Sequence, residues 1–261
     1  MPDPSHPIDA THGEPPSSPR IGTLREGALH AELRNWYRAR GDRLEVPVDG
    51  YVVDLVRGDQ LVEFQTGGFS SLRRKLPTLL TRHPVRVVTP IPVSRFIVRV
   101  SDAGEVLSER RSPKRGRIED VFAQLVSIPE LLAHPNFSLE AVLVEIDEVR
   151  VHRPGRAFRR RGWVVQSRAL RTVHASQVFA AVDEVAALLP RALPDSFGTA
   201  DVATAAGLSR RLAQQMLYCL TALGATARVG KCGNAILYRR TDRASTQVSR
   251  RGSTGSMRPT F

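Results

Sequence analysis

Three polar residues, Asp54, Glu63 and Gln65, stand on two short β-prone stretches that are separated by Gly58-Asp59. This dipeptide suits a two-residue hairpin turn, because glycine tolerates positive φ, and such a turn places Asp54 directly opposite Glu63. Carboxylates that face each other across two strands have Cβ atoms about 5 Å apart and repel unless a cation neutralises them. Because Mg²⁺ prefers oxygen ligands, the pair predicts a divalent-cation site. The alternative is a hairpin whose solvated face carries two acids by coincidence.

The remaining hairpin residues predict which face carries these acids. Side chains alternate along a strand, so the apolar residues of both stretches lie on one side and the polar residues on the other. The apolar side consists of Tyr51, Val53, Leu55, Val62 and Phe64. We expect that side to pack on a hydrophobic core and the acids to point away from it.

With Asp54 on one strand and Glu63-Phe64-Gln65 on the next, residues 21–100 resemble the PD-(D/E)xK nuclease superfamily. That superfamily combines a carboxylate on one strand, Glu-x-Lys on the next and a Glu on a preceding helix, and Glu-x-Gln is similar to its CoiA-like branch. The resemblance implies an α/β restriction-endonuclease-like fold, with a mixed sheet flanked by helices, and Mg²⁺ or Mn²⁺ as cofactor. The chain departs from the pattern at Val53, where proline is usual, and at Gln65, where lysine is usual.

A helix expected before the hairpin, at residues 21–40, carries the third acid that the resemblance calls for. Residues that recur every four positions form its stripe: Leu24, Ala28, Glu32 and Trp36. A carboxylate on or beside an apolar stripe is expensive to bury without a partner. The resemblance implies that Glu32 joins Asp54 and Glu63 as a metal ligand. Alternatively, Glu32 lies at the boundary of the stripe and its carboxylate reaches water.

A second helix is expected from Phe69, and Pro77 kinks or restarts it. Lys75 lies on the polar side of this helix and is one of three lysines in the chain, so it is the candidate to replace the missing strand lysine. Gln65 is a neutral amide, which can orient a water or offer its oxygen to a cation but supplies no positive charge. The candidate catalytic residues are therefore Asp54, Glu63, Gln65 and Lys75.

The composition indicates an anionic partner. The chain has 38 Lys and Arg against 26 Asp and Glu, a formal charge of +12, which calls for a polyanion and most simply for DNA. Nearly all of these cations are arginines, and a GC-rich coding sequence produces the same excess of arginine over lysine. The positions of the arginines therefore matter more than their number. Two cysteines are too few for a disulfide framework or a Cys-based zinc site. No apolar run reaches the roughly 20 residues of a membrane span, so we expect a cytoplasmic protein without membrane contact.

Two basic segments are candidate contacts to DNA phosphates. Residues 110–117 form a basic loop, and residues 153–161 form the tip of a long hairpin whose strands are expected at 138–151 and 163–173. From Arg150 to Arg171 the chain has eight arginines and no acid. Cations placed on phosphates release counterions and strengthen binding, whereas the alternative for both segments is a solvated charge run. The candidate contacts are Arg110, Arg111, Lys114, Arg115, Arg159, Arg160 and Arg161.

Further strands are expected at 85–92 and 96–100, and a helix is expected at 118–133 with Val121, Leu125, Ile128 and Leu132 facing inward. These elements complete a mixed sheet with flanking helices. We divide the chain into four parts. They are a disordered leader (1–20), a nuclease-like domain (21–175), a small domain (176–240) and a disordered basic tail (241–261).

The small domain resembles a winged helix-turn-helix domain. Helices are expected at 177–189, 200–206 and 210–223, followed by a β-hairpin at 225–238. The last helix buries an apolar face, on which Cys219 is a core thiol. Its outward side chains are of the types that read base edges and phosphates, although many winged helices instead bind proteins. The candidate DNA contacts are Arg210, Arg211, Gln214, Gln215 and, in the hairpin, Lys231.

These features favour a metal-dependent DNA endonuclease or DNA-processing nuclease that hydrolyses phosphodiester bonds, with the small domain aiding DNA binding. The alternative is a nuclease-derived fold without turnover, a DNA-binding or regulatory adaptor whose metal site is weakened by the missing lysine. The positive charge disfavours a purely structural, protein-binding role. Cutting both strands would usually require two active sites, so a homodimer is one expected assembly. The sequence has no His-x-x-x-His, Cys-x-x-Cys or Gly-rich phosphate loop.

Overall fold

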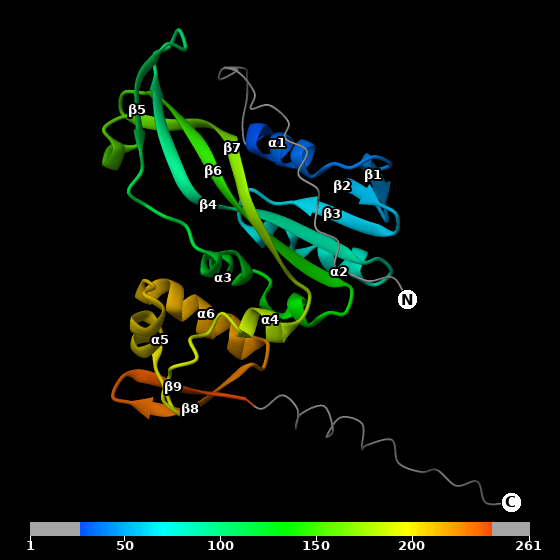
Figure 1. Ribbon diagram of the computed structural model, residues 1–261, viewed down its shortest axis with the longest axis vertical. Coiled ribbons are helices and arrows are strands. Elements are labelled where there is room, and N and C mark those ends of the chain that lie inside the picture. Colours follow the sequence, from blue (N-terminus) through cyan, green and yellow to red (C-terminus); the bar gives the residue numbers. More distant parts are fainter. Residues whose placement is uncertain (1–26, 242–261) are drawn as a thin grey trace, which may run out of the picture.

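A computed structural model describes residues 27–241 and shows a mixed α/β protein built on a mixed sheet with helices against it (Figure 1). The coarse fold class expected from the sequence is therefore confirmed. The leader predicted at 1–20 and the tail predicted beyond Thr241 lie outside the described residues. The larger unit contains α1 (Gly27–Tyr37), β1 (Arg43–Val48), β2 (Tyr51–Arg57), β3 (Gln60–Phe64), η1 (Phe69–Arg73), α2 (Lys75–Leu80), β4 (Val85–Val100), β5 (Val106–Arg111), η2 (Ile118–Asp120), α3 (Val121–Leu125), η3 (Pro129–Ala133), β6 (Phe137–His152), η4 (Phe158–Arg160) and β7 (Trp163–Phe179).

The predicted hairpin is confirmed and forms one side of the sheet. Strands β2 and β3 pair antiparallel around Gly58-Asp59, with Arg57 opposite Gln60 and Leu55 opposite Val62. Strand β1, which the sequence analysis missed, pairs with β2. Strand β3 then runs parallel to β4, β4 runs parallel to β6, and β6 pairs antiparallel with β7. The order is β1-β2-β3-β4-β6-β7, with β5 on β4.

The hairpin has two buried faces, so the prediction of a single apolar side is wrong. Leu55, Val62 and Phe64 belong to one core, whereas Val53 belongs to the core on the opposite face. The pairing of β2 with β3 ends at Leu55 and Val62, so Asp54 lies beyond the regular ladder. Strand β3 is covered by helices on both faces, and its acid is therefore buried instead of solvated.

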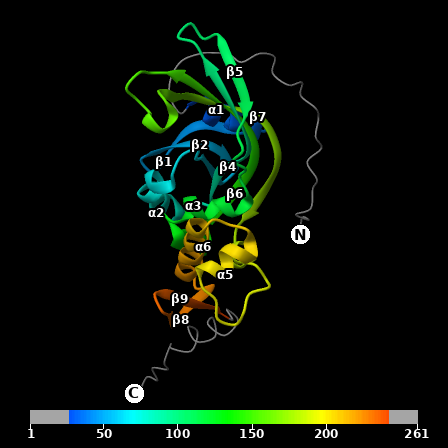
Figure 2. The same ribbon diagram turned by 90° about the vertical axis from the view of Figure 1, so that its left-hand side faces the viewer.

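Strand β4 is a single strand of 16 residues, although two shorter strands were predicted. Pro90 and Pro92 both lie within this strand, and its register with β6 shifts between Pro92 and Ser94. Strands β6 and β7 have 16 and 17 residues, and the far halves of β4, β6 and β7, together with β5, project beyond the rest of the sheet (Figures 1 and 2). The predicted domain boundary at 175/176 is wrong, because it falls inside β7.

Helices cover the two faces of the sheet's other half. Leu29 and Leu33 of α1 pack on one face, in a core that includes Phe64 and Val142. Helices α2 and α3 pack on the opposite face, where Leu76 belongs to the larger core. The expected helix at 118–133 is divided into η2, α3 and η3, and Pro129 begins η3, but the predicted inward residues of this helix are all buried.

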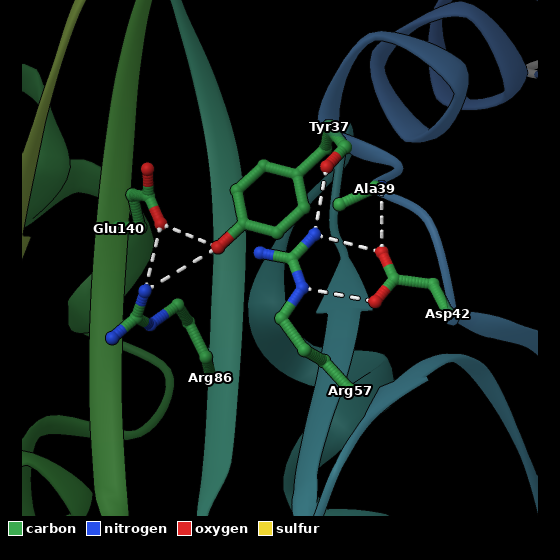
Figure 3. Close-up of polar contacts among 6 residues, drawn as sticks. All are labelled: Tyr37, Ala39, Asp42, Arg57, Arg86 and Glu140. Atoms are coloured by element: carbon green, nitrogen blue, oxygen red, sulfur yellow. Dashed lines mark hydrogen bonds and ion pairs between the residues drawn. The ribbon is translucent and has the colours of Figure 1, made fainter. Parts of the chain in front are cut away.

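A polar network fastens the end of α1 to the sheet (Figure 3). Arg57 donates two hydrogen bonds to the buried Asp42 carboxylate, at 2.7 and 2.9 Å, and a third to the backbone oxygen of Tyr37. The Tyr37 hydroxyl donates to Glu140 at 2.9 Å, and Arg86 contacts the same carboxylate at 3.4 Å. Because β2, β4 and β6 all contribute, the network fixes how α1 lies on the sheet.

The smaller unit consists of three helices followed by a two-stranded hairpin. It contains α4 (Val182–Ala186), α5 (Thr199–Ala206), α6 (Arg210–Ala222), β8 (Thr226–Cys232) and β9 (Ala235–Arg240). The helix predicted at 177–189 is too long at both ends: α4 spans only Val182–Ala186, and β7 continues to Phe179 by pairing with β6. Ser209 caps α6 by accepting a hydrogen bond from Leu212 N at 3.2 Å.

The smaller unit shares its core with the larger one. Cys219 of α6 is buried and its sulfur lies 3.9 Å from the backbone oxygen of Phe122 in α3, and both belong to one continuous core. Figures 1 and 2 show α6 beside α3, at the opposite end of the molecule from the projecting strands. Burial raises the pKa of the Cys219 thiol to about 12, which agrees with the predicted core role.

Candidate functional site

A pocket of about 480 Å³ opens where β3 ends, between the first turn of α1 and the 65–71 segment. It brings together three of the four candidate catalytic residues as lining, and the fourth, Lys75, contacts one of them. The pocket is lined by Gly27, His30, Asp54, Glu63, Phe64, Gln65, Thr66, Gly67, Gly68 and Ser71.

The Asp54 carboxylate is held by hydrogen bonds from two directions. Its Oδ2 accepts from the backbone N–H of Phe64 at 2.8 Å and lies 3.1 Å from Nε2 of His30. Burial by itself would raise the pKa of Asp54, but the His30 and Phe64 hydrogen bonds outweigh it and lower that pKa. Asp54 is therefore an ionised carboxylate at neutral pH and lines the pocket.

His30 is a pocket residue that the sequence analysis missed. Its hydrogen bond to Asp54 raises the pKa of the imidazole, against the opposing effect of burial. The ring also makes an edge contact with Phe64, with 6.0 Å between centroids. No sequence signal singled out this residue, because a lone histidine on a helix acquires a partner only when the helix is rotated and docked.

Glu63 is buried and paired with Lys75. Its Oε1 lies 2.5 Å from Nζ of Lys75, and the two side chains are 6% and 15% exposed. Lys75 also donates to the backbone oxygen of Val52 at 2.5 Å. Burial raises the pKa of Glu63 to about 7, with Lys75 opposing the rise and the nearby Asp54 charge adding to it. The predicted proximity of the two acids and the predicted approach of Lys75 from the helix are both present.

Gln65 reaches the pocket, but its amide nitrogen is engaged in the turn that follows. Nε2 donates to the backbone oxygen of Gly68 at 2.9 Å. The backbone of Gln65 is fixed to β4, because its N–H donates to Val88 and its oxygen accepts from the Thr89 hydroxyl. The side-chain oxygen is thus the group that Gln65 offers to the pocket.

Glu32 is not part of this site, so the metal ligand implied for it is wrong. Its Oε2 accepts a hydrogen bond from the backbone N–H of Leu170 in β7 at 2.6 Å. Leu29 and Leu33 set the rotation of α1 on the sheet, and that rotation turns Glu32 toward β7 and His30 toward Asp54.

The donor set for a cation is therefore a pair of carboxylates. Within residues 27–241, no group of three or more His, Cys, Asp and Glu side chains is placed to hold a metal ion. Mg²⁺ is commonly bound by one or two carboxylates together with substrate phosphates and waters, so two are sufficient. Oε1 of Glu63 is buried, and its close partner is the Lys75 ammonium, so a metal ion at this carboxylate would share it with Lys75.

The basic segment predicted as a loop at 110–117 is partly strand. Arg110 and Arg111 lie on β5, because the pairing of β4 with β5 continues to Arg111. Arg111 donates to the Ser94 hydroxyl at 2.7 Å and pairs with Glu145 at 3.4 Å. Arg115 donates to the backbone oxygen of Ser112, whereas Lys114 is exposed.

The predicted hairpin tip is present and exposed. Arg159, Arg160 and Arg161 follow Phe158, whose side chain is 95% exposed. In α6, the residues predicted to face outward include Arg210, Arg211 and Gln214, which are exposed, and Gln215, which is half-buried. Lys231 is exposed on β8.

Comparisons with known proteins identify a family and one relative. A family model described as a domain of unknown function (DUF8091) matches residues 27–180, which end just after β7. A protein of Treponema pallidum (strain Nichols), described as uncharacterized, is 33% identical over 223 residues, covering 84% of this chain and 87% of the relative. No solved structure matches the chain significantly. Among residues 27–241, no helix has the length and apolar content that a membrane crossing requires.

Proposed function

The chain belongs to the DUF8091 family, and we propose that it is a Mg²⁺-dependent nuclease that hydrolyses phosphodiester bonds in DNA. The observation that carries the proposal is the convergence of two carboxylates and a lysine at one pocket. Asp54 and Glu63 come from adjacent strands, and Lys75 contacts Glu63 at 2.5 Å. The resemblance to PD-(D/E)xK nucleases calls for these three groups, although here the lysine comes from α2.

The residues present fit a divalent cation. Hydrogen bonds keep Asp54 ionised. Oε1 of Glu63 is buried beside the Lys75 ammonium, which only partly offsets the effect of burial on the Glu63 pKa. A bound Mg²⁺ or Mn²⁺ would act as a Lewis acid toward a phosphate oxygen and would lower the pKa of a bound water. Asp54 and Glu63 would hold the cation, and His30 keeps Asp54 in its orientation through the 3.1 Å contact.

Lys75 and Gln65 have separate tasks in this proposal. The Lys75 ammonium compensates the Glu63 carboxylate and supplies positive charge beside the phosphate, where negative charge develops during hydrolysis. The Gln65 side-chain oxygen can accept a hydrogen bond from the attacking water, which would orient it. The ammonium group of Lys75 is thus the functional replacement for the strand lysine.

The sheet topology supports a path for DNA from the pocket to the basic segment. Because β6 occupies one edge of β4, all other partners of β4 share the opposite edge. Strand β3 pairs there with Val85–Val88, Gly116 N donates to Pro92 O, and β5 follows from Phe96. Along β4, Val88 and Pro92 are four residues apart, so roughly 13 Å separate the end of β3 from the segment that contains Lys114 and Gly116. We propose that Lys114 contacts a phosphate near the one that is cleaved.

We further propose that the smaller unit is a winged-helix domain that binds DNA through the exposed face of α6. A helix-turn-helix followed by a hairpin supports this, as do the exposed Arg210, Arg211 and Gln214. The packing of α6 on α3 leaves that face uncovered within the described chain, so the helix can serve both units.

Plasmid nicking in the presence of Mg²⁺ or Mn²⁺ tests the activity. We expect Asp54→Asn and Glu63→Gln to lower the cleavage rate at least about 100-fold, since each removes a ligand charge. Asp59→Asn is the matched control, because Asp59 is exposed at the turn of the same hairpin. The proposal fails if the wild type does not cleave DNA with either metal, or if the Asp54 and Glu63 variants cleave as fast as Asp59→Asn.

One observation favours a second candidate function, a DNA-binding or regulatory adaptor without turnover. Lys75 already supplies a cation to Glu63, so the site can exist without a metal ion. An adaptor would bind DNA equally well in EDTA and in Mg²⁺ and would not cleave it. Binding that is indifferent to EDTA, together with absence of cleavage, would select this alternative.

A further inference from the structure

The projecting half of the sheet sorts its charges onto two opposite faces. Residues paired side by side across strands point to the same side, and one such row runs from Arg110 of β5 through Ile97 of β4 and Glu148 of β6 to Arg168 of β7. The neighbouring rows of this face contain Arg95 beside Ile146, and Arg99 beside Arg150. We call the one acid and the five arginines of these rows the Glu148 cluster, which consists of Glu148, Arg95, Arg99, Arg110, Arg150 and Arg168.

Glu148 holds three of these arginines together. Its carboxylate is 1% exposed and accepts hydrogen bonds from Arg150 at 2.5 and 2.9 Å and from Arg168 at 3.3 Å, and Arg95 pairs with it at 3.3 Å. Burial alone would raise the pKa of Glu148, but these arginines lower it. One ionised carboxylate therefore positions three guanidinium groups on the same face.

The positive charge of the cluster is not compensated. Arg99 and Arg110 have no acidic partner in the described part of the chain, and Arg99 lies over the Trp163 ring, 4.6 Å from its centroid. The Nε atoms of Arg95 and Arg99 are buried and have no hydrogen-bond partner there. Unpaired guanidinium groups held close together bind an oxyanion readily, because each presents charged donors in a rigid plane.

The opposite face of the same strands has the reverse balance. Arg111 pairs with Glu145, and Arg171 pairs with both Glu109 and Asp147, each at 2.8 Å. Acids outnumber arginines among these residues. The excess of positive charge on the other face is therefore specific to that face, and general arginine abundance does not explain it.

The positive face is also the face that carries α1. Ile146, which pairs with Arg95, belongs to the core that Leu29 and Leu33 of α1 complete, and the first turn of α1 lines the pocket. We propose that the Glu148 cluster binds phosphates of the DNA backbone and holds the duplex along this face beyond the pocket. This proposal rests on the proposed function for its choice of ligand.

Binding of a fluorescein-labelled 20-base-pair DNA duplex, measured by anisotropy in EDTA between 50 and 400 mM KCl, tests the proposal without cleavage. The test variant is Arg110→Gln/Arg168→Gln, which changes exposed arginines on β5 and β7 and leaves Glu148 with two partners. The matched control is Arg82→Gln/Arg171→Gln, which removes the same charge from two exposed arginines outside the cluster, Arg171 on the opposite face of β7 and Arg82 after α2.

We expect the negative slope of log K against log salt to be shallower by about 1.8 in the test variant, since each lost phosphate contact contributes about 0.9. If binding of both proteins converges at 1 M salt, this slope corresponds to roughly 60-fold weaker binding at 0.1 M. The control variant should retain the wild-type slope. Arg110→Lys/Arg168→Lys should also retain it, which separates loss of charge from loss of folding.

Equal weakening by the test and control variants would overturn the proposal, because net charge alone would then explain binding. Unchanged binding by the test variant, or a wild type that does not bind the duplex at 50 mM salt, would overturn it as well. Failure of the proposed nuclease activity gives a different result, in which the cluster variants weaken binding but no protein cleaves DNA in Mg²⁺.

Discussion

The pH dependence of stability provides a direct test of the Glu63 environment. Its pKa is raised from 4.5 to about 7, mainly by burial, in a side chain that is 6% exposed. A carboxyl whose folded pKa is raised contributes stability below its unfolded pKa, and this contribution is lost as pH rises through the folded value. The contribution of Glu63 to wild-type stability should therefore fall between pH 4.5 and 7 and level off above pH 7.

The size of this loss follows from the shift. At about 1.4 kcal/mol per pH unit, raising the pKa from 4.5 to about 7 corresponds to roughly 3.5 kcal/mol over the whole titration, of which about 3 kcal/mol falls between pH 4.5 and 8.5. Glutamine has nearly the same shape and does not titrate, so Glu63→Gln should gain roughly 3 kcal/mol relative to wild type between pH 4.5 and pH 8.5. Comparing the two pH values removes any constant effect of the substitution, such as the altered contact with Lys75.

Urea unfolding in EDTA at the two pH values measures this difference. Glu130→Gln is the matched control, because Glu130 is exposed on η3 and its substitution should not change the pH dependence. If the wild type and Glu63→Gln show the same change in unfolding free energy between pH 4.5 and 8.5, then Glu63 is not a buried carboxyl and the pocket geometry is wrong.

Other contacts lead to three more predictions. At pH 8.5, 10 mM Mg²⁺ should raise the melting temperature of the wild type but not that of Glu63→Gln, because a ligand that binds only the folded state stabilises it; scanning fluorimetry measures this, and equal shifts would contradict metal binding at Glu63. Asp42→Asn should destabilise the protein by about 3 kcal/mol in urea unfolding, because it leaves Arg57 without its buried partner; a change below about 1 kcal/mol would show that the α1 anchor contributes little. A thiol reagent should label Cys232 but not Cys219 in the native protein, because only Cys232 is exposed, and mass spectrometry should find two labels only after unfolding.

Much of the site could be predicted from short stretches of sequence. The turn at Gly58-Asp59 was enough to pair β2 with β3 and to bring Asp54 near Glu63, because the register of a tight hairpin depends on a few neighbouring residues. The inward residues of the divided helix at 118–133 were also correct, because their spacing follows the helical period even where Pro129 interrupts the hydrogen bonding.

Other features could not be predicted because they depend on how distant elements dock. Glu32 was expected at the pocket, but His30 lies there instead. Which of the two reaches the pocket depends on the rotation of α1, and that rotation is set by Leu29 and Leu33 packing against the sheet. The continuation of β7 to Phe179 required pairing with β6, which overrode the helical pattern at 177–189.

By itself, the sequence determined the local hairpin, its two acids, the excess of arginine and the helical periods, since each depends on residues close together in the chain. Only the tertiary structure decided that Lys75 reaches Glu63, that His30 meets Asp54, and that the arginines of β4 to β7 divide between two faces. The physical reason is that side-chain direction over long distances depends on strand register and helix rotation. Both are set by packing and by irregularities such as the register shift between Pro92 and Ser94.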